Sequence, residues 1–446
     1  MRFHGTMRIN GVGHLEIGGC DTVKLAGKYG TPLWIMDEEY IREKCRRFRK
    51  AFMEGGRRGD VAYASKAFLT LAMAAIINEE GLSLDVVSQG ELYIALKAGF
   101  PPERIYFHGN NKSLDELKMA VKVGVGRIVV DNFYEIDLLE KAAGDRKVNI
   151  MLRVTPGVEA LTHDYIKTGQ EDSKFGFSIA DGDALTAVNK VHGMKNIVLK
   201  GIHCHIGSQI FETRPFVEAA DILLGFIRNI KHDFEIDMEE LNLGGGFGIY
   251  YSPGDEPRDI ASYADHIFHL VEDRAREYDL KMPKIIVEPG RIIAGPAGTT
   301  LYTVGSIKNI PGIRKYVSVD GGMTDNIRPA LYQARYEAII ANRAGEEAVE
   351  PVTIAGKCCE SGDLLIKDIC LPEIESGDIL GVSCTGAYGY SMASNYNKLP
   401  RPAVVLVREG TAELIVKRET PEDLIANEIL PKRLAKDVDL PYASMS

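Results

Sequence analysis

The feature that most constrains the fold of this chain is a regular alternation of strand-like and helix-like segments between residues 37 and 293. Apolar, strand-like runs occur at residues 60–64, 84–87, 104–108, 127–130, 148–154, 198–203, 238–243 and 284–288. Segments with helical periodicity occur at 38–52, 68–80, 90–98, 114–123, 133–143, 180–190, 214–231 and 259–278. Such alternation indicates βα units and a parallel sheet. Eight strands favour a (β/α)8 TIM-type barrel, which takes about 250 residues.

The rest of the chain has a different pattern. After residue 295 the helical period gives way to strand-like runs at 299–308, 316–319, 337–341, 349–355, 379–382, 403–408 and 411–417. Short extended pieces in residues 1–36 need partners elsewhere in the chain. A single core stops growing at about 250–300 residues. We therefore expect an α/β protein with two domains, a barrel over 37–293 and an all-β domain built from 1–36 and 294–446.

Composition excludes several classes of partner. The net charge of −10 argues against a nucleic-acid or anionic-membrane surface, because neutralising phosphates needs clustered lysine and arginine. The seven cysteines do not form a disulfide framework, and no ligand set has zinc-site spacing. No stretch approaches 18 uninterrupted apolar residues, and no export signal precedes residue 37. We expect a cytoplasmic protein without a metal.

Polar residues and glycines follow the predicted barrel strands. They are Lys66, Ser88, His108, Asn110, Arg153, His205, Gly244, Gly245, Gly246 and Glu288. Catalytic groups of TIM-type barrels come from the carboxyl ends of the strands. Lys66 follows a run of small residues, and a lysine with a freed neutral amine forms Schiff bases. By itself, one lysine after one strand is usually a surface residue.

Three motifs in the barrel region each allow a functional and a structural interpretation. The glycines at 244–246 let backbone N–H groups approach a phosphate, or simply make a tight turn. His205 could lie against a planar cofactor and Ser208 could bind phosphate, while His203 is expected to point into the core. Glu288 could pair with a protonated ring nitrogen and Arg291 with a carboxylate, or the two could form an ion pair.

Two stretches of the β region have unusual composition. Cys358 and Cys359 lie between a lysine and Glu360, so they are either small buried residues or include a proton donor. Residues 386–397 are rich in glycine, serine, asparagine and tyrosine, which is typical of a binding loop.

Taken together, these motifs resemble those of the diaminopimelate decarboxylases, pyridoxal-phosphate enzymes of the alanine-racemase and ornithine-decarboxylase fold group. The resemblance covers nearly the whole chain. Its motifs are YASKA (63–67), HCHIGSQ (203–209), EPGR (288–291), GGMTDNIRPALY (321–332), CES (359–361) and GAYGYSMASNYN (386–397). The last three are the more specific, since related decarboxylases share the cofactor motifs.

The resemblance implies the cofactor, the assembly and a role for each site residue. It implies pyridoxal 5'-phosphate held covalently by Lys66, and a homodimer whose active sites are shared between subunits. His205 would face the cofactor ring and Glu288 its nitrogen. The phosphate would be held by Ser208, Gly244, Gly245, Gly246, Gly290 and Tyr388, with Arg291 also at the cofactor. The substrate would be bound by Arg291, Arg328, Tyr332, Glu360 and Tyr388, and Cys359 of the other subunit would act as the proton donor.

This residue set predicts the substrate. Two arginines and a glutamate complement a second amino-acid head group, which ornithine and lysine lack. We therefore expect decarboxylation of the small molecule meso-2,6-diaminopimelate to L-lysine and CO2, the last step of lysine biosynthesis. The alternatives are a decarboxylase of ornithine, lysine or a carboxylated polyamine on the same fold, and a non-catalytic pyridoxal-phosphate carrier.

Overall fold

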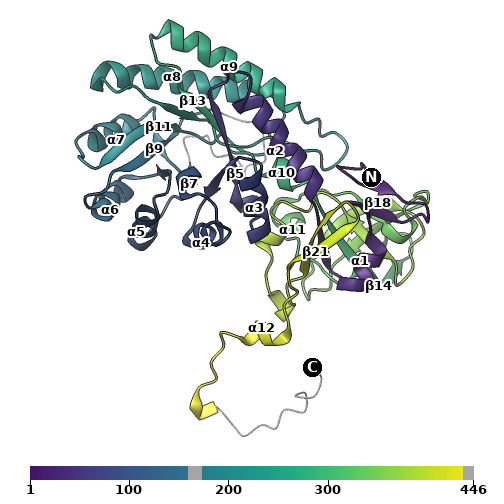
Figure 1. Ribbon diagram of the computed structural model, residues 1–446. Coiled ribbons are helices and arrows are strands. Elements are labelled where there is room, and N and C mark those ends of the chain that lie inside the picture. Colours follow the sequence, from purple (N-terminus) through teal and green to yellow (C-terminus); the bar gives the residue numbers. More distant parts are fainter. Residues whose placement is uncertain (159–172, 435–446) are drawn as a thin grey trace.

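The structure is a computed structural model that describes residues 1–158 and 173–434. It contains two domains that lie side by side, a barrel ringed by helices and a β domain that includes both the start and the end of the described chain (Figure 1). Among the described residues, no helix combines the length and the apolar character needed to cross a membrane.

Eight parallel strands close the barrel. They are β5 (Gly59–Ala64), β6 (Ser83–Val86), β7 (Ile105–Phe107), β8 (Arg127–Val130), β9 (Val148–Thr155), β11 (Ile197–His203), β12 (Glu240–Asn242) and β13 (Lys284–Val287). Each strand pairs with the next in chain order, and the pairing of β13 with β5 completes the ring. The predicted TIM-type barrel is confirmed. A short strand that was not predicted, β10 (Phe177–Ser178), lies outside the ring on β9.

The helices that cover the barrel follow the predicted segments. They are α2 (Glu38–Met53), α3 (Leu71–Glu79), α4 (Gln89–Lys97), α5 (Leu114–Val123), α6 (Phe133–Ala143), α7 (Asp183–His192), α8 (Arg214–Phe234) and α9 (Ile260–Glu277). Several begin at a side chain that accepts a backbone N–H. Ser113 and Glu116 form a capping box at α5, and Asn132 caps α6. These caps fix the residue at which each of these two helices begins.

The interior of the barrel is filled rather than hollow. Side chains from five of its strands meet there: Ala62, Tyr106, Val129, Met151 and Ile286. All five are at most 4% exposed. A packed interior confines any ligand to the loops at the ends of the strands.

The β domain combines strands from both ends of the chain. Its strands are β4 (Leu33–Asp37), β14 (Gly298–Ile310), β15 (Arg314–Val319), β16 (Ala338–Ile340), β17 (Glu350–Ala355), β18 (Leu364–Leu371), β19 (Ile379–Val382), β20 (Ala403–Arg408) and β21 (Thr411–Val416). Strand β4 lies between β14 and β20, antiparallel to the first and parallel to the second. The last extended piece of the N-terminal segment therefore does find partners in the C-terminal half.

The remaining elements are short, and some differ from the predicted pattern. Strands β1 (Arg8–Ile9), β2 (Leu15–Ile17) and β3 (Cys20–Asp21) form a small separate sheet. A helix that was not predicted, α1 (Thr22–Tyr29), begins where Asp21 accepts two backbone N–H groups. Helices α10 (Arg291–Ala294), α11 (Arg328–Tyr332) and α12 (Pro421–Ile425) complete the described chain.

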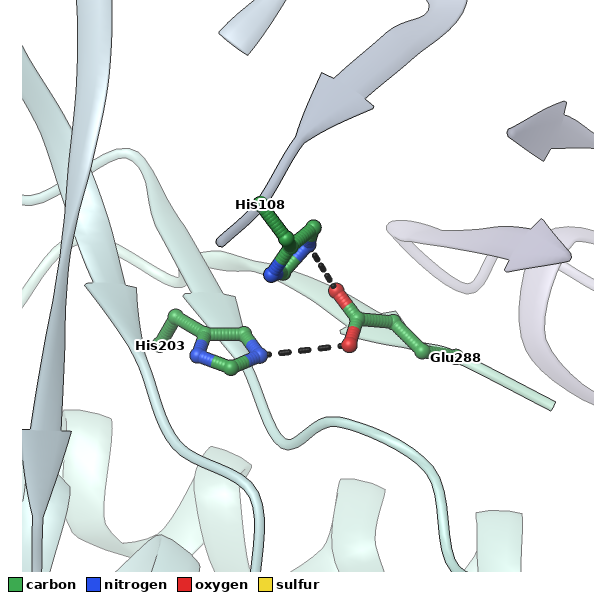
Figure 2. A group of neighbouring side chains, drawn as sticks. All are labelled: His108, His203 and Glu288. Carbon is green, nitrogen blue, oxygen red and sulfur yellow. Dashed lines mark hydrogen bonds and ion pairs between the residues drawn. The ribbon is translucent and has the colours of Figure 1, made fainter. Parts of the chain in front are cut away.

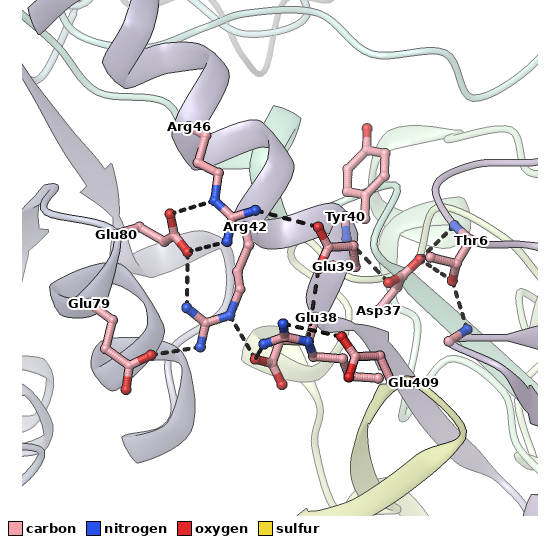
Figure 3. A network of polar contacts seen from close by, with 12 residues as sticks. Thr6, Asp37, Glu38, Glu39, Tyr40, Arg42, Arg46, Glu79, Glu80 and Glu409 are labelled. Carbon is pink, nitrogen blue, oxygen red and sulfur yellow. Dashed lines mark hydrogen bonds and ion pairs between the residues drawn. The ribbon is translucent and has the colours of Figure 1, made fainter.

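A network of charged side chains connects the domains along α2 (Figure 3). Arg42 contacts Glu38, Glu79 and Glu80 at 2.7–2.9 Å, and it is 12% exposed. Glu38 also contacts Arg408 on β20 at 3.3 Å. Helix α2 is thus joined by ion pairs to the barrel helix α3 on one side and to the β domain on the other.

Candidate functional site

A cavity of about 740 Å³ opens at the carboxyl ends of the barrel strands, where the β domain adjoins them. Most residues predicted for the site line it: Lys66, His205, Ser208, Gly245, Gly246, Glu288, Gly290, Arg291, Arg328, Tyr332 and Tyr388. Residues far apart in the sequence and from both domains therefore face one space. Gly244, Cys359 and Glu360 are not part of its lining.

Lys66 lies in a 3-10 turn, η1 (Ser65–Ala67), directly after β5. Its side chain is exposed to the cavity, and no hydrogen bond or ion pair of its amine is found in the part of the chain that the structure describes. The β domain fixes this turn, because Tyr388 N–H and the Ser391 hydroxyl both donate to Ala67 O, at 2.9 and 3.0 Å. The amine is thus available to react while its backbone is held.

Glu288 follows β13 and is bound by three buried side chains. His203 Nε2 lies 3.2 Å from Oε2, and His108 Nε2 lies 2.9 Å from Oε1 (Figure 2). Asn242 Nδ2 donates to Oε1 at 2.7 Å. The His108 contact is an ion pair at short range and lacks the alignment of a hydrogen bond. His203, expected to point into the core, is fully buried but contacts the functional carboxylate.

The network keeps Glu288 ionised. Burial raises the pKa of a carboxyl group, but His108 and His203 outweigh burial and hold the pKa of Glu288 well below its ordinary value. Burial lowers the pKa of His108, while Asp85 and Glu288 more than offset this and raise it. For His203 burial prevails and lowers the pKa to about 4. The carboxylate is therefore flanked by two imidazoles with opposite pKa shifts, since His108 is shifted toward its charged form and His203 toward its neutral form.

The glycine run after β12 has tightly restricted geometry. A Cβ at Gly245 would lie 2.2 Å from the carbonyl oxygen of Glu288, and one at Gly244 would lie 2.5 Å from that of Cys204. Two of the three N–H groups are already used, since Gly244 donates to Asn242 Oδ1 and Gly245 to His205 Nδ1. Of the three N–H groups, that of Gly246 is the one for which the described residues provide no acceptor. The main effect of the glycines is therefore to let backbone segments approach closely. They do not supply three free donors.

His205 has a defined tautomer. Because Nδ1 accepts the N–H of Gly245 at 3.1 Å, the ring proton is on Nε2. Burial, together with the charges of Lys66 and Arg153, holds the pKa of His205 well below its ordinary value. The residue is a neutral imidazole at the wall of the cavity, suited to contact with a flat ring.

Two buried arginines, Arg291 and Arg328, line the cavity. Arg291, on α10, donates to Ser208 Oγ at 2.8 Å, and its guanidinium lies 4.7 Å from the centre of the Tyr388 ring. Arg328, on α11, comes from the β domain, as does the half-buried Tyr332 at the end of the same helix. The predicted alternative of an ion pair between Arg291 and Glu288 is not found in the described structure.

Cys359 and Glu360 are exposed and lie outside the cavity lining of their own chain. Cys359 N–H donates to Asn397 Oδ1 at 2.7 Å, and Glu360 Oε1 accepts the N–H of Gly362 at 3.1 Å. Both therefore belong to an ordered turn on the surface. Ser88 also lies outside the lining and caps α4.

Several residues of the site could not be assigned a role from the sequence. His108 ends a predicted strand, which was the one available signal, while Asp85 and Asn242 lie within strands. Tyr251 lies in the loop after the glycine run and Tyr336 in the loop before β16. No local pattern marks these two tyrosines, and only the fold brings them to the arginines.

The chemistry of this cavity fits pyridoxal phosphate. It offers a lysine amine with no partner within residues 1–158 and 173–434, a neutral imidazole, an ionised carboxylate and a glycine-lined wall where side chains would collide with backbone. It also holds two arginines that have no carboxylate partner among the described residues. These are the groups needed for a Schiff base, a flat ring, a ring nitrogen and bound anions.

Comparison with known proteins agrees with the site. Residues 38–295 match the family model described as pyridoxal-dependent decarboxylase, pyridoxal binding domain. Diaminopimelate decarboxylase of Bacillus subtilis is 57% identical over 95% of this chain and 97% of its own length. The enzyme of the same name from Staphylococcus aureus is 49% identical over 95% and 99%. The crystal structure of diaminopimelate decarboxylase from M. jannaschii in complex with L-lysine has a TM-score of 0.90 and 37% identity, covering 96% and 99%.

Proposed function

The chain belongs to the diaminopimelate decarboxylase family of pyridoxal-dependent enzymes, and on that premise we propose how its residues carry out the reaction. It is a carboxy-lyase that uses pyridoxal 5'-phosphate to convert meso-2,6-diaminopimelate to L-lysine and CO2, the last step of lysine biosynthesis. The observation that carries the assignment is that a single cavity is lined by Lys66 and by two buried arginines, Arg291 and Arg328.

Lys66, His205 and Glu288 form the part of the cavity that we assign to the cofactor. When bound, pyridoxal phosphate supplies an electron sink for the electron pair left at Cα after CO2 departs. Lys66 would hold the cofactor covalently, with His205 against its ring and Glu288 at its nitrogen. A carboxylate kept ionised by His108 and His203 holds a proton on that nitrogen and so strengthens the sink.

The phosphate is held near the glycine run. The N–H groups of Gly246 and Gly290, the Ser208 hydroxyl and Tyr388 act as donors, since the structure leaves these groups at the cavity wall. Gly244 and Gly245 act by lacking side chains, because their N–H groups already have acceptors. This division refines the expectation that the whole run donates to phosphate.

The far end of the substrate lies at the arginines. Arg291, Arg328 and Tyr332 bind the carboxylate that is not lost, and Glu360 binds the ammonium beside it. A substrate with one amino-acid head would leave two buried cations without an anion, which is costly. This charge pattern favours diaminopimelate over ornithine or lysine.

The active site is shared by two copies of the chain. Cys359 and Glu360 face solvent and lie outside the lining of their own cavity, as expected of residues that serve a partner's site. We infer a cytoplasmic homodimer in which Cys359 of one subunit protonates Cα in the other. Mixing inactive Lys66→Ala and Cys359→Ala proteins, after dissociation and reassembly, should restore about a quarter of wild-type sites by random pairing. Restoration of none would contradict shared sites.

The substrate is tested by measuring CO2 release from meso-diaminopimelate, L-ornithine and L-lysine at equal concentrations. Rapid release from diaminopimelate alone is expected. Release from ornithine with none from diaminopimelate would sink the assignment, and binding of cofactor with no release from any amino acid would favour a carrier.

A further inference from the structure

The two arginines of the cavity carry charge that no described residue neutralises. Arg291 is 8% exposed and Arg328 is 7% exposed, and neither forms an ion pair within residues 1–158 and 173–434. Their hydrogen-bond acceptors are hydroxyl groups: Ser208 for Arg291, Tyr336 for Arg328, and Tyr251 for both. Buried cations are normally paired. This part of the cavity is therefore arranged for an anion that arrives with a ligand.

Tyr251 is the residue that joins the two arginines. Its hydroxyl oxygen accepts Arg291 Nη1 and Arg328 Nη1, each at 2.8 Å. Arg291 belongs to the barrel and Arg328 to the β domain, so one oxygen sets the spacing of two cations from different domains. The Tyr251 ring packs edge-on against Tyr336, with ring centres 5.5 Å apart, which fixes its orientation.

The bonding capacity of a phenol then restricts what Tyr251 can do next. A tyrosine hydroxyl has two lone pairs and one hydrogen. Both lone pairs are occupied by the arginines, so only the hydrogen remains. Tyr251 lines the cavity, and no acceptor for its hydrogen is found among the residues that the structure describes. Toward a ligand, Tyr251 can act only as a donor.

We propose that the Tyr251 hydroxyl donates to the carboxylate of diaminopimelate that is not lost, as a third member of the site formed with Arg291 and Arg328. This proposal rests on the proposed function and adds a specificity-determining residue to it. An ammonium group is rejected at the same position, since Tyr251 has no lone pair left to accept it. The bound oxyanion is the substrate's rather than the cofactor's, because Arg328 and Tyr332 share α11, whereas the glycine run provides separate groups for phosphate.

The test compares ligands with and without that carboxylate on the holoenzyme. L-Lysine keeps the carboxylate after the reaction, and cadaverine is the same diamine without it. In Tyr251→Phe, calorimetric titration should show L-lysine binding about 10- to 100-fold weaker, since one hydrogen bond to a charged group is lost. Cadaverine binding and the cofactor dissociation constant should not change. Weaker cofactor binding with unchanged lysine affinity would assign the oxyanion to phosphate and overturn the proposal.

Two matched variants separate direct donation from other effects. Tyr336→Phe also removes an acceptor from Arg328, but Tyr336 does not line the cavity. If it weakens L-lysine binding as much as Tyr251→Phe does, Tyr251 only positions arginine and the proposal is wrong. Tyr250→Phe removes a neighbouring hydroxyl that donates to Glu337, and it should leave lysine binding unchanged. Steady-state kinetics should show a higher KM for diaminopimelate in Tyr251→Phe with a smaller change in kcat.

These results also separate this proposal from the proposed function. Wild-type enzyme that fails to release CO2 from diaminopimelate would refute the function itself. Active wild-type enzyme with an unchanged Tyr251→Phe variant would refute only the role of Tyr251. The phenylalanine variant keeps the ring contact with Tyr336, and each arginine keeps a second hydroxyl acceptor, so the fold should be preserved.

Discussion

His108 and Glu288 follow β7 and β13, strands that are not neighbours in the barrel, and His108 Nε2 approaches Glu288 Oε1 to 2.9 Å. Both side chains are 6% exposed. Asp85 Oδ1 lies 3.8 Å from the same Nε2 atom, so a second carboxylate supports the charge of the imidazole. The ionisation state of the carboxylate that we propose for the cofactor nitrogen is therefore set by residues from separate strands.

Removing the charge of Glu288 should impair the reaction more than binding. In Glu288→Gln the ring nitrogen loses its anionic partner, and kcat should fall about 100-fold, a typical cost for one lost electrostatic contact to the reacting system. Steady-state kinetics with cofactor content measured by absorbance tests this. Glu240→Gln is the control, because Glu240 pairs with Arg127 at the far end of the barrel and should leave kcat unaffected.

Lys66 should be the residue that carries the cofactor. Borohydride reduction followed by peptide mapping should place the adduct on Lys66, since this lysine is exposed and lines the cavity. Lys174→Ala is the matched control, because Lys174 lines the same cavity and its loss should leave the label in place. An adduct on any other lysine would refute the site assignment.

His203 should make stability depend on pH. The folded protein keeps His203 neutral down to about pH 4, whereas the unfolded chain binds a proton near its ordinary pKa of 6.5. Between these values the unfolded state holds more protons, so the free energy of unfolding decreases as pH falls, by up to about 1.4 kcal/mol per pH unit. Urea unfolding from pH 4.5 to 6.5 should show a shallower dependence in His203→Gln. The matched control, His269→Gln on the surface of α9, should keep the wild-type slope.

Arg42 should contribute to stability through its three carboxylate partners. The carboxylates of Glu38 and Glu80 are only 12% and 7% exposed, and in Arg42→Met each loses a hydrogen-bond donor. The free energy of unfolding should therefore fall by about 1–3 kcal/mol. Thermal or urea unfolding measures this. Arg214→Met breaks a pair whose arginine is 85% exposed, and it should not change stability measurably. Equal effects of the two substitutions would contradict a special role for the network.

Gly245 should not tolerate a side chain. In Gly245→Ala the new Cβ would meet the carbonyl oxygen of Glu288 at 2.2 Å, so the end of β13 must move and the catalytic carboxylate with it. Decarboxylation should be largely lost, with a stability cost of about 1–3 kcal/mol. Gly225→Ala is the control, because a Cβ there meets nothing within 4 Å and alanine favours the helix α8. Wild-type kinetics in the Gly245 variant would refute this account.

The barrel could be predicted from the sequence because its pattern is local. Each buried strand is a short apolar run and each helix has a clear period, so all eight strands were predicted to within a few residues. Strand β18 was missed because Asp368, with φ 53°, interrupts the alternation of side chains along it. Helix α1 was missed because its eight residues include Gly27 and follow extended pieces.

The site was only partly predictable. The motif residues around Lys66, His205 and Glu288 follow strands, where the fold itself brings them together. Tyr251 contacts Arg291 and Arg328, which lie 40 and 77 residues away in the sequence, so no local spacing could reveal it. The occupied N–H groups of Gly244 and Gly245 likewise depend on Asn242 and His205, and a glycine run alone cannot show which amides are free.

The position of β4 has a consequence for how the protein is made. Leu33 on β4 pairs with Ala403 on β20. A strand near the beginning of the chain therefore cannot form this pairing until the ribosome has synthesised a strand near the end. The barrel segments in between can assemble during synthesis, whereas β4 keeps an open edge until β20 arrives. Release of a chain that stops short of β20 would leave this edge bare, so truncated products are expected to be recognised by chaperones and proteases rather than to persist as partial enzymes.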